Sequence, residues 1–196
     1  MESLITKKKE KKRESLLNSA YELFMDKGIS NTTIDQICRK AGIAKGTFYL
    51  YFHDKEDILK SLIKRISYTL LQNAYARVNK NRSFIENLVQ MADYLIDYFK
   101  NDTGTVQVLK KDFTWPITEE EFISTDDPLM SSIRDMIEQY SESSGLEEHK
   151  ILLRIYALFS MIASVCYSAI IDHFPDDIDM FKPEIFSMIR GSFNKD

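Results

Sequence analysis

Lys45, Gly46 and Tyr49 lie within five consecutive residues, and their combination suits contact with a DNA duplex. A lysine ammonium can reach a phosphate or a base edge, and a glycine lets the backbone come close to the duplex. In a short helix Lys45 and Tyr49 share one face, because they are four residues apart. We therefore expect this face to point outward and to contact DNA.

The aromatic residues around this group allow a second interpretation. Phe48 and Phe52 recur at a step of four residues after Ala44, so we expect these three side chains to face a core. Tyr49 and Tyr51 could also be packing residues of a hinge. We favour DNA contact for Tyr49, since an exposed tyrosine beside a lysine and a glycine has no evident role in a core.

Three further polar residues flank the group. The hydroxyls of Thr33 and Thr47, together with nearby backbone amides, can donate hydrogen bonds to phosphates. Lys55 follows at the start of the next predicted helix and could bind the flanking DNA backbone. These residues complete a hypothetical surface for nucleic acid.

Residue patterns typical of enzymes are missing from the sequence. It has no glycine-rich phosphate loop, no paired metal ligands on a helix, and no nucleophile beside a suitable base. His173 with Asp176 and Asp177 is more typical of a solvated loop than of a metal site, and Cys166 lies in an apolar segment typical of a core. We therefore predict a protein that is not an enzyme and that needs neither a metal nor a cofactor.

The charge is distributed unevenly along the 196 residues. Residues 1–65 contain 14 Lys and Arg against 9 Asp and Glu, whereas the remainder contains 12 against 21. A net charge of +5 on the first part and −9 on the second predicts that the first part alone meets a polyanion.

Several features favour a cytoplasmic protein. The N-terminus lacks the apolar core of a signal peptide, and the two cysteines lie far apart in sequence, as in a reducing compartment. The longest apolar stretch, residues 158–171, is interrupted by serines and is shorter than a membrane-spanning segment. We expect no membrane association.

The elements that must hold these residues are all predicted to be helices. Apolar residues at helical spacing predict helices over residues 8–27 and 33–41, each closed by a glycine, Gly28 or Gly42. Thr33 and Gln36 have the spacing of a capping box. A short third helix over 45–51 and a long fourth over 55–80, opened by Asp54 and Asp57, follow.

The remainder is predicted to be a helical body. Helices are expected over residues 81–100, 105–113, 128–143, 147–173 and 180–193, with a loop between the second and third of these. The whole is an all-α protein of about nine helices: a helix-turn-helix domain over residues 1–54, and a helical effector-binding and dimerisation domain over 55–196.

At these residues the sequence resembles the TetR family of bacterial regulators. The matching segment is TTIDQICRKAGIAKGTFYLYFHDKEDIL, residues 32–59, preceded by AYELFMDKG, residues 20–28. The combination of a glycine turn, Lys-Gly-Thr, aromatic residues and a downstream lysine is specific. One position differs: members often carry serine where this chain has Ala44, which removes a helix-capping hydroxyl worth about 1 kcal/mol.

The resemblance implies a homodimeric repressor that binds a palindromic operator and is released by a small molecule. It implies phosphate contacts for Thr33, Thr47, Tyr49 and Lys55, and places Lys45 and Gly46 nearest the bases. Tyr51 and His53 occupy positions where contacts to the DNA backbone are plausible.

The last two predicted helices, over about 147–193, are expected to form the dimer interface. Residues 151–171 are apolar on nearly every side, so that one face can pack inward and another against a second copy. Ile185, Met188, Ile189 and Phe193 are expected to supply a matching apolar stripe. Burial of the long segment at the centre of a single body is the alternative.

The body also contains many aromatic residues and methionines, which can line an adaptable apolar pocket. We predict an apolar or aromatic effector, because few basic residues are expected in the interior. A regulator without any effector remains an alternative. The candidate ligand-binding residues are Tyr98, Trp115, Tyr156, Phe159 and Tyr167.

A different class of protein would also have a basic N-terminal helix. A helical adaptor could use this helix to bind an acidic protein or a membrane surface. Such an adaptor has no need of the tight turns or of the Lys45-Gly46-Thr47 group, so we favour the DNA-binding regulator.

Overall fold

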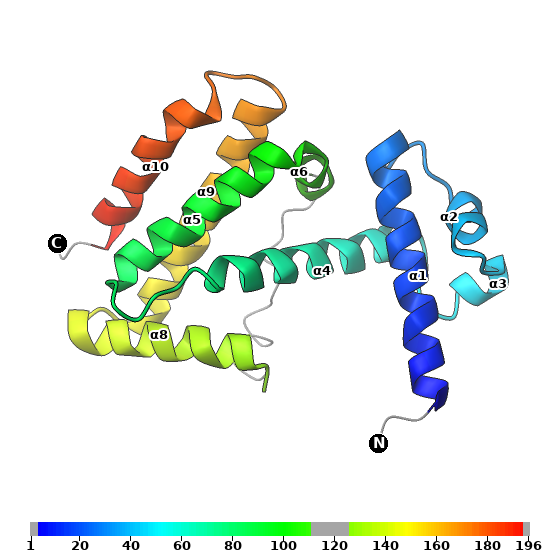
Figure 1. Ribbon diagram of the computed structural model, residues 1–196, viewed down its shortest axis with the longest axis horizontal. Coiled ribbons are helices and arrows are strands. Elements are labelled where there is room, and N and C mark those ends of the chain that lie inside the picture. Colours follow the sequence, from blue (N-terminus) through cyan, green and yellow to red (C-terminus); the bar gives the residue numbers. More distant parts are fainter. Residues whose placement is uncertain (1–3, 111–125, 194–196) are drawn as a thin grey trace. The chain divides into compact units, whose positions relative to one another are not determined.

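The computed structural model describes residues 4–110 and 126–193, and these form nine α-helices and no β-strand (Figure 1). The all-α prediction is therefore confirmed. The chain divides into two compact units, residues 1–66 and 67–196. The predicted domain limit at residues 54 and 55 is where α4 begins, and the N-terminal unit also contains residues 55–66. The helices are α1 (Leu4–Lys27), α2 (Ile34–Ala41), α3 (Lys45–Phe48), α4 (Lys55–Tyr75), α5 (Phe84–Asn101), α6 (Thr103–Lys110), α8 (Pro128–Ser144), α9 (Glu148–Ile170) and α10 (Ile178–Ser192).

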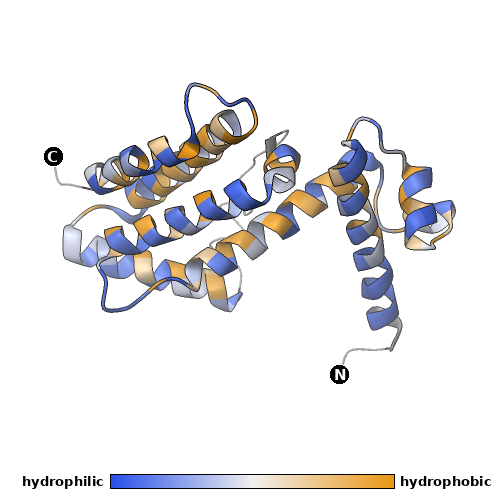
Figure 2. Ribbon diagram, turned by 45° about the horizontal axis from the view of Figure 1, so that its top comes forward, coloured by the Kyte–Doolittle hydropathy of each residue, from blue (hydrophilic) through white to orange (hydrophobic). Residues whose placement is uncertain are grey.

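In the N-terminal unit, α1 supplies one side of the core. Its stripe of Leu16, Leu17, Ala20, Leu23 and Phe24 is buried as predicted, and α1 packs against α2. The helix begins four residues earlier than the sequence predicts, so it also contains the basic run. Figure 2 shows these first turns as strongly hydrophilic. They project as a solvated basic extension of α1.

The turn into α2 follows the predicted signals closely. Thr33 is the N-cap: its hydroxyl accepts a hydrogen bond from the Gln36 amide at 3.3 Å, and the Gln36 side chain accepts one from the Thr33 amide at 2.9 Å. At the other end Gly42 has φ +66°, the left-handed conformation that favours glycine. The buried Thr32 hydroxyl adds a bond to the Gly28 carbonyl at 2.9 Å.

The third helix is shorter than predicted, with four residues followed by turns. Its N-cap Ala44 makes no side-chain hydrogen bond, as expected for a residue without a hydroxyl. Phe48 and Phe52 are buried, but Ala44 is exposed, so the prediction that Ala44 faces the core is wrong. A helix of one turn does not keep the four-residue spacing beyond its ends.

In the C-terminal unit, α5 packs against α9 and α10, and α9 also contacts α6, α8 and α10. Ion pairs join α5 to α10: Lys182 lies 2.6 Å from Asp93, and Arg190 lies 2.8 Å from Glu86. The apolar residues of α9 that face this core are Ile151, Ile155, Leu158, Ile162, Cys166 and Ala169.

Two elements of this unit differ from the prediction. The fourth helix ends at Tyr75 and not at residue 80, because Asn87 of α5 binds both backbone groups of Asn79 and holds a loop there. Of the stripe predicted for a second copy, Ile185 and Ile189 are buried inside this chain, as is Phe193, and Met188 is 51% exposed. The predicted end of the helix over 105–113 lies outside the described residues.

The length of α9 also corrects an expectation. Its 23 residues are long and apolar enough to cross a bilayer by length and composition alone, so length does not exclude a membrane span. The core helix of a soluble protein passes the same test, and α9 packs against four other helices of its unit. It is the only described helix with these properties.

Candidate nucleic-acid interface

The exposed side of α3 and of the turn after it carries the predicted central residues. Lys45 and Gly46 are exposed, and Tyr49 is 50% exposed while its ring packs edge-on against buried Phe48 at 5.4 Å between centroids. The predicted outward face of Lys45 and Tyr49 is thus present. Phe48 anchors this face to the core of the unit, so that the exposed tyrosine is held in a defined position.

Lys45 is not a freely moving cation in this structure. Its ammonium lies 3.0 Å from a carboxylate oxygen of Asp35 on α2. This hydrogen bond, and the negative charge of Asp35, raise the pKa of Lys45 above its usual value. Both side chains are more than half exposed, so the pair is weak and can exchange for a phosphate or a base.

Gly46 has no internal reason to be glycine. A Cβ added here meets no atom within 4 Å, and its φ does not lie in the left-handed region. In a helix, glycine is less stable than alanine by about 0.5–1 kcal/mol. The missing side chain leaves open space at this position, which a partner could approach closely.

Thr33 is the N-cap of α2, and Thr47 is the third residue of α3. The exposed Thr33 hydroxyl already accepts the capping hydrogen bond and keeps its own proton for an external acceptor. Thr47 is half-buried in the single turn of α3. Their contact with phosphates stays a prediction.

Tyr51 and His53 lie in the segment between α3 and α4. Tyr51 is half-buried and His53 is exposed. The backbone amide of His53 donates to Asp57 at 2.8 Å, and the amide of Asp57 donates to Asp54 at 2.8 Å, which fixes the predicted start of α4. The imidazole is thereby carried by an ordered turn.

Lys55 binds backbone oxygens that the local sequence does not predict. Its ammonium donates to the backbone oxygens of Ile29 at 2.7 Å and Thr32 at 3.0 Å, with Ser30 at 3.4 Å. Lys55 therefore closes the turn between α1 and α2. Its predicted contact with a phosphate would require it to leave these carbonyl groups.

Leu50 is the second feature missed. It is 74% exposed, the largest exposed fraction among the large apolar residues found exposed in the described chain. The sequence spacing predicts this exposure, because Leu50 is two residues from both Phe48 and Phe52 and so falls on the opposite side of a helical turn. An apolar side chain at this place can contact the methyl group of a thymine.

The predicted ligand-binding residues are only partly brought together. A cavity of about 390 Å³ lies among α5, α6 and α9, and Tyr156 and Tyr167 line it. Tyr98 and Phe159 are not among its lining residues, and Trp115 lies outside the described residues. The remaining lining residues are Phe99, Val106, Leu109, Ser160, Ala163 and Ser164.

The described part of the chain holds no group of three or more His, Cys, Asp or Glu residues that could bind a metal ion. The thiols of Cys38 and Cys166 are both buried, and burial raises the pKa of Cys166 to about 12. Neither has the features of a nucleophile.

Comparison with known proteins gives a match over the N-terminal unit. Residues 16–62 match the family described as bacterial regulatory proteins, tetR family. The HTH-type transcriptional regulator SrpR of Pseudomonas putida is 31% identical over 84 residues, which cover 43% of this chain and 39% of the relative. The match thus spans less than half the length of that relative.

Solved structures resemble nearly the whole chain. A putative tetR family transcription regulator from Shewanella sp. PV-4 is similar with a TM-score of 0.64 and 18% identity, over 93% of this chain and 95% of that one. The regulator FadR from Bacillus subtilis, solved in complex with stearoyl-CoA, has a TM-score of 0.58 and 18% identity, over 90% and 96% of the two chains. At this identity the likeness shows the fold alone.

Proposed function

We propose that the chain, whose residues 16–62 match the TetR family of bacterial regulatory proteins, is a transcriptional regulator that binds a palindromic DNA operator and represses. Two copies bind together, and a small molecule releases them. The N-terminal unit reads the DNA, and the C-terminal unit dimerises and holds the effector. Such a protein acts in the cytoplasm, where bacterial DNA lies.

The exposed face of α3 is the observation that carries this proposal. Lys45 and Tyr49 point away from a core that Phe48 fills, and Gly46 between them leaves space that nothing in the unit uses. A short rigid helix with such a face fits the major groove, about 12 Å wide. Thr33, Thr47, Tyr51, His53 and Lys55 are the proposed flanking contacts.

The basic extension of α1 supports the same partner. Lys7, Lys8 and Lys9 are exposed in its first turns, and the unit as a whole is basic whereas the rest of the chain is acidic. Each lysine near a phosphate releases a counterion, which strengthens binding at low salt. The proposed adaptor function explains this charge but not the face of α3, and we do not favour it.

For the homodimer we propose an interface formed by α9 and α10. Leu153 is 55% exposed and Met188 51%, so apolar side chains remain on the solvent side of both helices. The two helices form one surface, because Arg154 donates to the Ser192 carbonyl at 2.7 Å. In a two-fold dimer of this kind, the two N-terminal units would contact DNA at sites about 34 Å apart, which is one turn of DNA, or at a multiple of this distance.

The cavity among α5, α6 and α9 is the proposed effector site. Its lining, among the residues that the structure describes, is apolar and aromatic with serine and tyrosine hydroxyls and no charged group, which favours an apolar or aromatic ligand. An effector releases DNA only if it binds the DNA-incompetent state more tightly. Tyr156 and Tyr167 are the proposed contacts.

Selection of bound sequences from a random duplex pool tests the proposal. Wild type is expected to enrich a palindrome, and Tyr49→Ala and Lys45→Ala are expected to lose it while remaining folded. Lys60→Ala, at an exposed position of α4, serves as the control. Failure of wild type to enrich any sequence at moderate salt would contradict the proposed function.

A further inference from the structure

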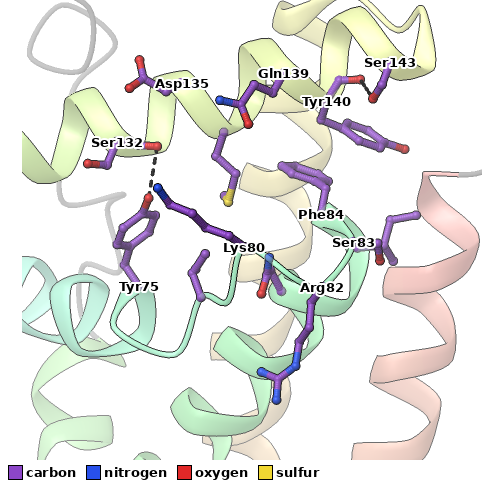
Figure 3. Close-up of a pocket in the computed structure, with 14 residues that line it drawn as sticks. Tyr75, Lys80, Arg82, Ser83, Phe84, Ser132, Asp135, Gln139, Tyr140 and Ser143 are labelled. Carbon is purple, nitrogen blue, oxygen red and sulfur yellow. Dashed lines mark hydrogen bonds between the residues drawn. The ribbon is translucent and has the colours of Figure 1, made fainter.

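A second, larger cleft lies in the C-terminal unit, away from the proposed effector cavity. It has a volume of about 580 Å³ and is bounded by the end of α4, the loop from α4 to α5, the start of α5, and α8 (Figure 3). It shares no lining residue with the cavity among α5, α6 and α9. Its size is in the range of pockets that hold small molecules.

One wall of the cleft is aromatic and rigid. The rings of Phe84 and Tyr140 are stacked, with their planes 9° apart and their centroids 4.2 Å apart. The Tyr140 hydroxyl donates to the Phe193 carbonyl at 3.0 Å, and the Phe193 ring packs edge-on against both. A flat apolar ligand meets a preformed surface here, so it loses little free energy in ordering the protein.

The loop that faces this wall is also fixed. Both backbone groups of Asn79 bind the side chain of Asn87, at 2.9 and 3.1 Å, and the Asn79 carbonyl accepts the Arg82 amide at 3.0 Å. Lys80 lies between these anchored residues. Its backbone position is therefore defined although its side chain is exposed.

The charges around the cleft select the ligand. Figure 3 shows the Lys80 side chain crossing toward Tyr75 and Ser132, whereas Arg82 points away from α8. Within the described residues the Lys80 ammonium has no hydrogen bond and no ion pair. Of the described residues that line the cleft, Asp135 alone carries a carboxylate. One inward cation with one nearby carboxylate favours a single negative charge and disfavours a polyphosphate.

We propose that this cleft binds a small aromatic monocarboxylate. The carboxylate pairs with Lys80, and the ring lies along Phe84 and the thioether of Met136. The assignment rests on the combination of the unpaired Lys80 ammonium with the apolar wall formed by Phe84 and Met136. The proposal concerns binding only, and it stands whether or not the protein binds DNA.

Calorimetric titration of the full chain with 1-naphthoate tests it, with the neutral 1-naphthalenemethanol as the matched ligand. Naphthoate is expected to bind at least about tenfold more tightly than the alcohol, because only the acid pairs with Lys80. Lys80→Met keeps the length of the side chain, removes the charge, and is expected to remove this preference. Lys150→Met, an exposed lysine of α9, is the control and is expected to change nothing.

Filling the cleft locates the ligand. Met136→Trp and, at an exposed position of the same wall, Gln139→Trp are expected to abolish naphthoate binding in protein whose circular dichroism is that of wild type. Ala163→Trp, which fills the other cavity, is expected to leave binding intact. Loss of binding in Ala163→Trp alone, equal affinity for acid and alcohol, or no binding to wild type would each overturn the assignment.

Discussion

The ammonium of Lys55, in the first turn of α4, lies 2.7 Å from the backbone oxygen of Ile29, in the turn between α1 and α2. With the carbonyl groups of Ser30 and Thr32 it uses all three of its donors on this turn. One side chain thus joins the start of α4 to the turn between α1 and α2.

Lys55→Met is therefore expected to destabilise the protein. The substitution keeps the apolar stem but leaves three backbone oxygens without their donor, at a cost of about 1–2 kcal/mol for these partly exposed groups. Unfolding in urea, followed by circular dichroism, measures this loss. Lys60→Met removes an exposed lysine 3.8 Å from Glu56 in the same helix and is expected to change stability by less than about 0.5 kcal/mol. Equal effects of the two substitutions would show that the carbonyl contacts contribute nothing.

Gly46→Ala is expected to separate stability from DNA binding. The added methyl meets no atom of the unit and favours helix, so stability should stay level or rise by up to about 1 kcal/mol. Operator affinity should fall by about tenfold or more, because the methyl occupies space left for the duplex. Gly42→Ala is the contrast: at φ +66° it should cost about 1–2 kcal/mol. Unchanged operator affinity in Gly46→Ala would show that the duplex does not come close to the backbone at Gly46.

The features that could be predicted from sequence are those that depend on neighbouring residues. Thr33 and Gln36 are three residues apart, and Gly42 directly follows the apolar periodicity, so the capping box and the closing turn of α2 were both predictable. The outward position of Tyr49 followed from the spacing of Phe48 and Phe52.

Features that depend on packing between distant segments could not be predicted. Lys55 binds a carbonyl 26 residues away, and nothing in the local sequence distinguishes it from a lysine that faces solvent. The end of α4 depends in the same way on Asn87, which binds Asn79 from the following helix. The cleft beside Phe84 and Tyr140 exists only because α5 and α8 are in contact. No periodicity or motif in the sequence predicts this contact between the two helices.

Asp127 is expected to make stability depend on pH in acid. It caps α8 by accepting the amides of Leu129 and Met130, and it accepts the Tyr68 hydroxyl at 2.7 Å. The Tyr68 hydrogen bond, followed by the amides, lowers the pKa of Asp127 below its usual 3.8. The stabilisation is therefore present above pH 3.8 and is lost as the pH falls through the folded-state pKa.

Asp127→Ala is accordingly expected to cost about 1 kcal/mol at pH 7 and less at pH 3. Urea unfolding at both pH values gives the two differences from wild type. Asp126→Ala, at the exposed neighbouring position, should show a small difference at either pH. A cost for Asp127→Ala that is the same at pH 3 and pH 7 would rule out the ionised carboxylate as its source.

The thiols of Cys38 and Cys166 are expected to be unreactive in the folded protein. Burial raises the pKa of Cys166 to about 12, and burial is also the first cause of the raised pKa of Cys38. An aromatic disulfide reagent at pH 8 should detect no thiol in native protein and two in denaturant. Because the unfolded Cys166 thiol ionises near pH 9 and the folded one does not, stability should fall as the pH rises above 9. Rapid native labelling at pH 8 would contradict the burial of both.

Leu50→Ala and Lys45→Ala are expected to weaken operator binding in different ways. Leu50 is 74% exposed, so its truncation should change stability by less than about 0.5 kcal/mol. If its side chain contacts a base methyl group, affinity falls but the dependence of affinity on salt does not change, since no counterion is involved. Lys45→Ala should lower affinity. If its ammonium contacts a phosphate, the substitution should also reduce the slope of the logarithm of the binding constant against the logarithm of the salt concentration, by about 0.9 for each N-terminal unit.

Titrating a labelled operator at several salt concentrations yields both quantities for each variant. Lys60→Ala provides the reference for an exposed lysine of the same unit that lies on α4. A Lys45→Ala variant with reduced affinity and an unchanged slope would assign Lys45 to a base edge and not to the backbone. A Leu50→Ala variant that binds as wild type would mean that the most exposed apolar side chain of the N-terminal unit lies outside the DNA contact, and the proposed interface would then keep the contacts of Lys45, Gly46, Thr47 and Tyr49 without it.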